Sequence, residues 1–160
     1  MRLLALDLST NCGWSLFEKG KGAPRFGTFK LPPAPEGEHE RRFVTLFEWL
    51  HDMRSLHQFD ALAFERPILP RKSGDLATTM HTLTLLWVLA TVVQLFAGLQ
   101  AMRCIPVPVQ AAKFALTGKK NATKDEMVAA AMNVVNWKIK SHHEADAGSV
   151  GVYAYGVLFP

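Results

Sequence analysis

From Leu76 to Met102 the chain contains no Asp, Glu, Lys or Arg over 27 residues. An apolar run of this length is long enough to span a membrane as a helix. A lipid-facing helix rarely carries many polar groups, whereas a helix between a sheet and a partner can. The run holds Thr78, Thr79, His81, Thr82, Thr84, Thr91, Gln94 and Gln100. The pattern therefore favours a buried helix of a soluble protein, and we expect no membrane association.

Length and composition indicate one globular domain. The chain has 160 residues, 49% of them hydrophobic and 20% charged, so we expect a single domain over residues 1–160 and not a disordered chain. The net charge of +4 permits nucleic-acid binding without requiring it. Cys12 and Cys104 form no CxxC pair, which argues against a disulfide framework or a cysteine zinc site. With an acid at Asp7 inside the first apolar stretch, the N-terminus is unlike a signal peptide, and we expect a cytoplasmic protein.

Apolar periodicity predicts strands and helices in an α/β order. The predicted strands are Arg2–Leu8, Trp14–Lys19, Arg25–Lys30, Phe59–Glu65 and Ala101–Val107. The predicted helices are His39–His57, the uncharged run, Val109–Leu116 and two helices opened by capping boxes at Thr123 and Ser141. The first three strands suggest an antiparallel meander, and the whole order predicts an α/β fold around a mixed sheet.

Two acids lie within otherwise apolar strands. Asp7 follows a run of Leu and Ala, and Glu65 ends the apolar run Ala61–Phe64, at the strand end where α/β sheets place ligands. An ionised carboxylate there is costly unless a cation or hydrogen bonds compensate it. Alternatively, Asp7 caps the following turn and Glu65 pairs with Arg66. Two such acids in two core strands favour a functional site.

A third group opens the last predicted helix. His143 and Asp146 are three residues apart and share one helix face, where a histidine and a carboxylate can ligate a divalent metal. Glu144 falls where it would close the Ser141 capping box, so we expect it to be structural; all three could equally be acids and polar groups favoured at a helix start. Oxygen ligands from separate elements suit Mg²⁺ or Mn²⁺, which can support attack of water on a phosphodiester. The candidate set is Asp7, Glu65, His143 and Asp146.

Basic residues are concentrated in one segment. Residues 103–142 carry a net charge of +5, and the remaining residues carry −1. Lys124 lies in the first turn of its helix, where the helix dipole disfavours a cation unless a phosphate binds there. A solvated basic face is the alternative, above all for Lys119 and Lys120. The segment's cations are Arg103, Lys113, Lys119, Lys120, Lys124, Lys138 and Lys140.

Four blocks of this sequence together resemble the RuvC-type Holliday-junction resolvases. LALDLSTNCGWSL is similar to their first strand and turn, and FDALAFERP to their second acidic strand. PVPVQAAKFALTGKKNATKDEM resembles their segment with two lysines spaced eleven apart, and HHEADAGSVGVYAYG their closing helix. The blocks occur in the family's order and cover nearly the whole chain. Within the family, the chain looks closest to the compact bacteriophage-type members.

The resemblance implies a ribonuclease-H-like fold with a five-stranded mixed sheet flanked by helices. It implies Asp7, Glu65 and Asp146 as acidic metal ligands, with His143 in the place of a further acid or histidine. Lys113 and Lys124 would contact the scissile or neighbouring phosphates. Mg²⁺ would be the cofactor, with Mn²⁺ substituting. The DNA-binding residues would be Ile68, Arg71, Lys72, Lys113, Lys119, Lys120 and Lys124.

The family acts as a homodimer on four-way DNA junctions, which implies the same partners here, with the uncharged helix as a packing surface, in a bacterial or phage-infected cell. Ile68 stands where the family often bears an aromatic wedge, and an aliphatic side chain can also insert between bases. Gly148, Gly151 and Gly156 are poor helix formers, so we expect the last helix to be irregular and closely packed.

The sequence thus predicts a Mg²⁺-dependent, structure-selective endonuclease of the crossover-junction type. A sugar-kinase or actin-like ATPase is a second hypothesis, because its first hairpin also begins with an acid in a strand; such proteins need two lobes around the nucleotide. A catalytically inactive DNA-binding or membrane-associated module on the same fold is a third.

Overall fold

The computed structural model describes residues 1–35, 39–68 and 76–159. Five strands form one sheet in the order β3-β2-β1-β4-β5, with β1 antiparallel to β2, β2 antiparallel to β3, and β1, β4 and β5 parallel. The expected α/β fold with a five-stranded mixed sheet is confirmed. The strands are β1 (Arg2–Asp7), β2 (Asn11–Glu18), β3 (Arg25–Lys30), β4 (Ala61–Glu65) and β5 (Arg103–Val107).

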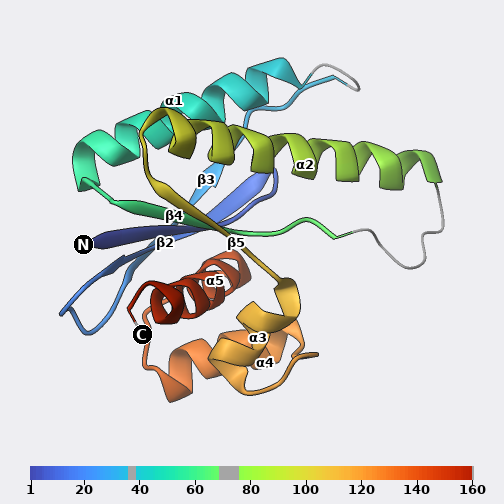
Figure 1. Cartoon of the computed structure of the whole chain (residues 1–160). Helices are drawn as coiled ribbons and strands as arrows, with labels where there is room; N and C mark the ends of the chain where they lie inside the picture. Colours follow the sequence, from blue (N-terminus) through green and yellow to red (C-terminus); the bar gives the residue numbers. More distant parts are fainter. Residues whose placement is uncertain (36–38, 69–75, 160) are drawn as a thin grey trace.

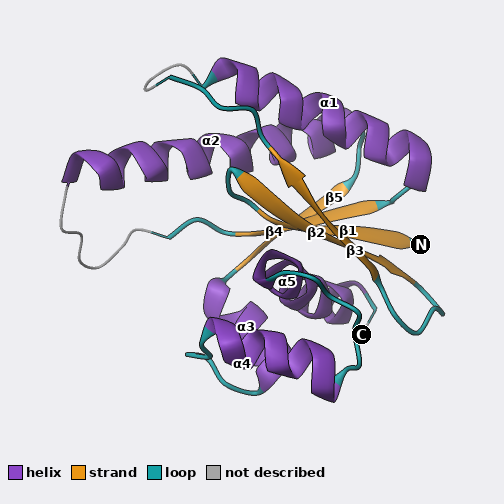
Figure 2. Ribbon diagram, turned by 180° about the vertical axis from the view of Figure 1, so that it is seen from behind, coloured by secondary structure: helices purple, strands orange, loops and turns teal. Residues whose placement is uncertain are grey.

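Helices cover both faces of the sheet, which explains why its central strands are apolar throughout. Two helices, α1 (Glu40–His57) and α2 (Leu76–Leu99), lie on one face (Figure 1). The view from behind shows the other helices gathered on the opposite face (Figure 2). These are α3 (Val109–Thr117), α4 (Lys124–Ala129), the π-helix η1 (Ala130–Val134) and α5 (His142–Leu158).

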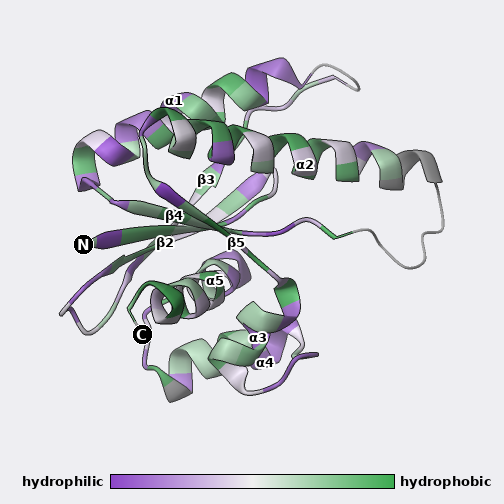
Figure 3. Cartoon of the chain, in the orientation of Figure 1, coloured by the Kyte–Doolittle hydropathy of each residue, from purple (hydrophilic) through white to green (hydrophobic). Residues whose placement is uncertain are grey.

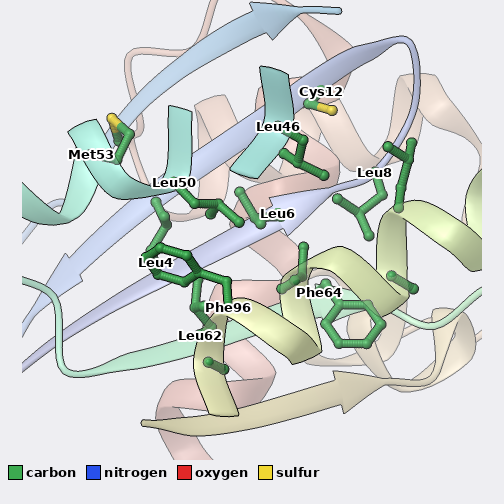
Figure 4. Close-up of a cluster of buried hydrophobic side chains, with 14 of the residues drawn as sticks. Leu4, Leu6, Leu8, Cys12, Leu46, Leu50, Met53, Leu62, Phe64 and Phe96 are labelled. Carbon is green, nitrogen blue, oxygen red and sulfur yellow. The ribbon is translucent and has the colours of Figure 1, made fainter. Parts of the chain in front are cut away.

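Alternate residues of each central strand face opposite layers. Leu4 and Leu6 of β1 pack under α1 and α2, in a cluster with Leu50 and Phe96 (Figure 4). Leu3 and Ala5 face α5 and join the other core. One face of α1 provides buried or half-buried contacts to the same cluster: Phe43, Leu46, Phe47, Leu50 and Met53.

The last helix differs from its prediction in regularity but not in packing. α5 is one continuous helix, so the expected irregularity is wrong. Its glycines do allow close packing: a Cβ on Gly148 would lie 2.5 Å from the Trp137 ring, and one on Gly151 would lie 2.0 Å from the Phe17 ring. Tertiary contact with aromatic side chains therefore overrides the weak helix propensity of glycine.

Several element boundaries also differ from the prediction. β2 begins at Asn11 instead of Trp14, because the Ser9 hydroxyl accepts a hydrogen bond from the Asn11 amide and completes the turn before that residue. β4 and β5 begin two residues later than expected. The Thr123 capping box is complete.

The capping box predicted at Ser141 is only half formed. The Ser141 hydroxyl accepts the Glu144 amide as expected, but the Glu144 carboxylate accepts the Lys140 amide at 2.5 Å instead of the N-cap amide. Glu144 is buried, so its expected structural role agrees with these contacts.

The prediction that the uncharged helix is buried is half right. Leu89, Val93 and Phe96 of α2 are fully buried in the core. The opposite face is apolar as well, with Trp87 46% exposed and Leu95 56% exposed, and Figure 3 shows the hydrophobic colouring along much of the helix. By length and composition alone, Met80–Leu99 could cross a membrane, a test that the core helix of a soluble protein also passes. This exposed apolar face is the side of the helix for which the sequence analysis expected a packing partner.

Candidate active site

Two of the predicted acids lie level with one another at one edge of the sheet. Leu6 of β1 pairs with Phe64 of β4, so Asp7 and Glu65 are the next residues of two parallel neighbouring strands. Leu6 and Phe64 both belong to the core beneath α1 and α2. Because side chains alternate along a strand, both carboxylates emerge on the opposite face, toward α5.

The start of α5 brings the third predicted group to these acids. The Nδ1 atom of His143 lies 2.9 Å from the Asp7 carboxylate, in a hydrogen bond between residues 136 positions apart. When Nδ1 carries the proton that is donated to Asp7, the Nε2 atom of this ring is left as an acceptor or ligand. The structure thus brings Asp7 and His143, both candidates from the sequence analysis, into direct contact.

Close contact with β2 fixes this end of α5. A Cβ on Gly13 would lie 2.0 Å from the carbonyl oxygen of His143, so only glycine permits the observed approach. Further along, the buried Ser15 hydroxyl donates to the Ala147 carbonyl oxygen at 2.8 Å. These contacts hold the helix at a fixed distance above β1.

The three acids affect one another's ionisation. Burial, together with the charges of Asp7 and Asp146, raises the pKa of Glu65 to about 7. Burial and the charge of Asp7 raise the pKa of Asp146 to about 6. Burial also raises the pKa of Asp7, against the opposing effect of its hydrogen bond to His143. Like charges held out of water repel one another, so this cluster favours a proton or a cation among them.

Two predicted lysines face the same cluster. The charge of Lys113 lowers the pKa of Glu65 and of Asp146, and the charge of Lys124 lowers that of Asp7 and of Asp146. Lys113 is half-buried, and its Nζ atom donates to the carbonyl oxygen of Ala122 at 2.7 Å. Lys124 is exposed at the first turn of α4.

The remaining predicted residues lie outside this cluster of acids. Lys119 forms an exposed ion pair with Glu126 at 2.7 Å, and Lys120 is exposed beside it. Ile68 is 56% exposed beyond the end of β4. The predictions for Arg71 and Lys72 lie outside the described residues.

His142 is a neighbour that the sequence analysis did not single out. Its ring lies 4.1 Å from that of His143, centroid to centroid, and burial followed by the charge of His143 lowers its pKa. The available signal was the histidine doublet itself, since adjacent residues at a helix start can both border a site at the helix end.

The acids offer the kind of ligand atoms that a divalent cation prefers. Their described positions, however, do not form a coordination site. Within residues 1–35, 39–68 and 76–159, no three His, Cys, Asp or Glu side chains converge closely enough to ligate an ion. Hard carboxylate oxygens are nevertheless the ligands that Mg²⁺ and Mn²⁺ prefer, and the raised pKa values reflect uncompensated negative charge. Asp7, Glu65 and Asp146, with His143 beside them, are the residues suited to hold such an ion.

Searches for similar sequences and for similar structures gave different results. No protein-family model and no curated protein sequence matches the chain. Among solved structures, RuvC from Thermus thermophilus matches with a TM-score of 0.71 at 18% identity, over 99% of this chain and 96% of RuvC. The chain therefore has an α/β fold of the ribonuclease-H-like class.

The form of that fold is the one found in RuvC-type resolvases. T. thermophilus RuvC in complex with Holliday junction substrate matches with a TM-score of 0.75 at 17% identity, over 98% of this chain and 94% of that protein. The yeast mitochondrial Holliday junction resolvase Ydc2 matches with a TM-score of 0.63 at 8% identity, over 94% and 76% of the two chains. At these identities the similarity establishes the fold alone, and the chemistry has to be argued from the site.

Proposed function

We propose that this protein is a divalent-metal-dependent endonuclease that cleaves four-way and other branched DNA junctions, a crossover junction endodeoxyribonuclease. The observation that carries the proposal is that three carboxylates, from β1, β4 and α5, lie near one another and near two lysines at one edge of the sheet. The charges of these groups influence one another's pKa values, so the groups share one small region. Acids for a metal beside cations for a phosphate are the components of metal-assisted phosphodiester hydrolysis.

Each residue has a separate task in this proposal. Asp7, Glu65 and Asp146 hold Mg²⁺ or Mn²⁺, which when bound lowers the pKa of water and stabilises charge on the phosphate. His143 orients the Asp7 carboxylate through their hydrogen bond. The two cationic residues that bind the scissile or adjacent phosphates are Lys113 and Lys124.

The proposed substrate is supported by the fold and by one exposed side chain. T. thermophilus RuvC, which shares this fold, has been solved with a Holliday junction substrate. Ile68 is exposed in the segment directly after Glu65, close along the chain to the acids. An apolar side chain there can insert between base pairs at a junction.

We propose further that two copies pair through the exposed face of α2. Met80, Thr84, Trp87, Thr91 and Leu95 are all exposed and recur every three or four residues, so they form one stripe along the helix. An uncharged stripe of this length is typical of a helix that packs against a second helix. Symmetric pairing would give the dimer two active sites, one for each of two strands of a junction.

Cleavage of synthetic DNA tests the proposed activity. The protein is incubated with four-way, three-way and linear DNA, with and without Mg²⁺ or Mn²⁺. We expect metal-dependent cleavage of branched DNA, and Asp7→Asn should lower the rate at least about a hundredfold while junction binding persists. The control is Asp52→Asn, which changes an exposed acid on α1.

That assay, together with measurements of junction binding and an ATP titration, also separates the alternatives. Full activity of Asp7→Asn would contradict the proposed site. Binding of junctions without cleavage in either metal would leave an inactive DNA-binding module. Binding of ATP without binding of DNA would favour the kinase-like hypothesis.

Sedimentation tests the proposed pairing. Trp87→Glu should convert a dimer to a monomer, because it places a charge in the centre of the stripe. Leu56→Glu is the matched control, since Leu56 is 74% exposed and belongs to a different helix, α1. A wild-type protein that sediments as a monomer at micromolar concentration would refute the pairing.

A further inference from the structure

A groove lies outside the acidic site, between the edge strand β3 and the segment 136–140. Its volume is about 650 Å³. Arg25 and Thr28 of β3 line one side, and Trp14 of β2 also lines it. The other side is formed by Asn136, Lys138 and Lys140. We refer to this hollow as the β3 groove.

The segment that forms the second side is held firmly in place. The buried Trp137 ring packs 5.0 Å from the Phe26 ring, centroid to centroid, and the Trp137 amide donates to the Ala131 carbonyl oxygen at 2.8 Å. The Lys140 amide donates to the buried Glu144 carboxylate. The segment is thus fixed at both ends, and its exposed cations border a preformed hollow.

The β3 groove is strongly cationic. Arg25, Lys138 and Lys140 are all exposed, and within the described ranges none of them takes part in an ion pair. Among the described residues that line the groove, Glu144 is the one acid, and its carboxylate already accepts the Lys140 amide. Three exposed cations around one hollow, none of them in an ion pair among the described residues, are the arrangement expected for binding a polyanion.

The groove is connected with the acidic site through two sets of residues. Lys140 also lines a second hollow, which it shares with Lys124 and His142 beside the acids. On the β3 side, Thr28 pairs with Gly13, whose backbone contacts the His143 carbonyl. The groove therefore begins next to the site and runs along β3 toward Arg25, away from it.

We infer that the β3 groove binds the phosphate backbone of a DNA arm that leads away from the cleavage site. This inference rests on the proposed function and adds to it a second contact surface. Its cations face the phosphates and not the reacting bond, so they contribute affinity independently of sequence. An acidic protein segment would also suit the charge, but the continuity with the acidic site favours the nucleic acid.

The salt dependence of DNA binding tests this inference. Binding of a four-way junction is measured between 50 and 200 mM salt in the Asp7→Asn background, with a Lys138→Ala/Lys140→Ala double variant and with Arg25→Ala. Each lost phosphate contact should reduce the slope of log affinity against log salt by about 0.9. Between 50 and 200 mM salt, the affinity of the double variant should therefore fall by a factor about twelve times smaller than the fall for the parent.

A matched control lies at a distant position. Arg103 is the exposed first residue of the other edge strand, as Arg25 is of β3, so Arg103→Ala removes the same charge without touching the groove. This control should retain the parent slope.

The outcomes separate this inference from the proposed function. If the groove variants bind junctions with the affinity and slope of the Asp7→Asn parent while the wild-type protein cleaves junctions, the inference is wrong and the proposed function stands. If the parent neither binds nor cleaves DNA, both are wrong. In protein that retains Asp7, the groove variants should cleave at the wild-type rate when enzyme is saturating. Loss of that rate at unchanged affinity would also overturn the inference.

Discussion

Replacing Glu65 with Gln should stabilise the metal-free protein at pH 8. Burial and two neighbouring acids raise the pKa of Glu65 from its ordinary 4.5 to about 7 in the folded chain. Below pH 4.5 the carboxyl group is protonated in both folded and unfolded chains. As the pH rises from 4.5 to 7, the unfolded chain releases the proton while the folded chain retains it, so stability falls, and above pH 7 the whole loss is present.

The magnitude follows from the two pKa values. Their difference corresponds to about 3 kcal/mol, and relaxation of the site with entry of water reduces this to about 1–3 kcal/mol. Because glutamine has nearly the same shape and no charge, Glu65→Gln should recover this free energy at pH 8 and change little at pH 4.5. In a protein of this size, the midpoint of thermal unfolding should rise by roughly 2–10 °C.

Thermal unfolding in a chelating buffer measures the effect, with Glu48→Gln on the exposed face of α1 as the control. Adding Mg²⁺ should stabilise the parent protein by mass action and should stabilise Glu65→Gln much less. Equal stabilities of the parent and Glu65→Gln from pH 4.5 to 8 would refute the argument that Glu65 is an uncompensated buried acid. A variant that is less stable at pH 8 than the parent would refute it as well.

Four further substitutions test the packing and the charges around the site. Gly151→Ala should destabilise the fold by about 1–3 kcal/mol because its Cβ would overlap an aromatic ring, whereas Gly156→Ala, with open space around it, should stabilise α5 by up to about 1 kcal/mol; chemical unfolding measures both. Gly13→Ala should lower single-turnover cleavage by about a hundredfold while circular dichroism stays unchanged, because it displaces His143. Lys113→Gln should move the acid limb of the pH–rate profile to higher pH, since its charge lowers the pKa of two nearby acids.

The sequence was sufficient to predict the sheet and the position of its acids, because both depend on local patterns. Apolar runs ended by turns identified all five strands, and their order indicated the mixed sheet. Asp7 and Glu65 were conspicuous because a charge interrupts an otherwise apolar strand. Such signals come from neighbouring residues and need no knowledge of the tertiary structure.

Features that depend on tertiary contact were not predictable in the same way. The Glu144 carboxylate accepts the Lys140 amide because the chain approaches α5 from that side, and the capping-box pattern does not specify that approach. The glycines of α5 indicated irregularity by propensity, but the rings of Trp137 and Phe17 fill the space they leave. The uncharged helix was expected to lie between the sheet and a partner, but an absence of charge did not specify which residues of α2 form the buried face and which the exposed one.

The register between β1 and β4 explains why an acidic site and a dense core can share the same two strands. In β1 the even-numbered Leu4 and Leu6 face the core beneath α1 and α2, and in β4 Leu62 and Phe64 do the same. Asp7 at the end of β1, like its counterpart in β4, then faces α5. A slip of one residue in either strand would bury a carboxylate beneath α1 and turn leucines toward the site. Burial of an uncompensated charge in the core would strongly destabilise the fold. The core thus fixes the register, and the register in turn holds the two acids level beneath the start of α5.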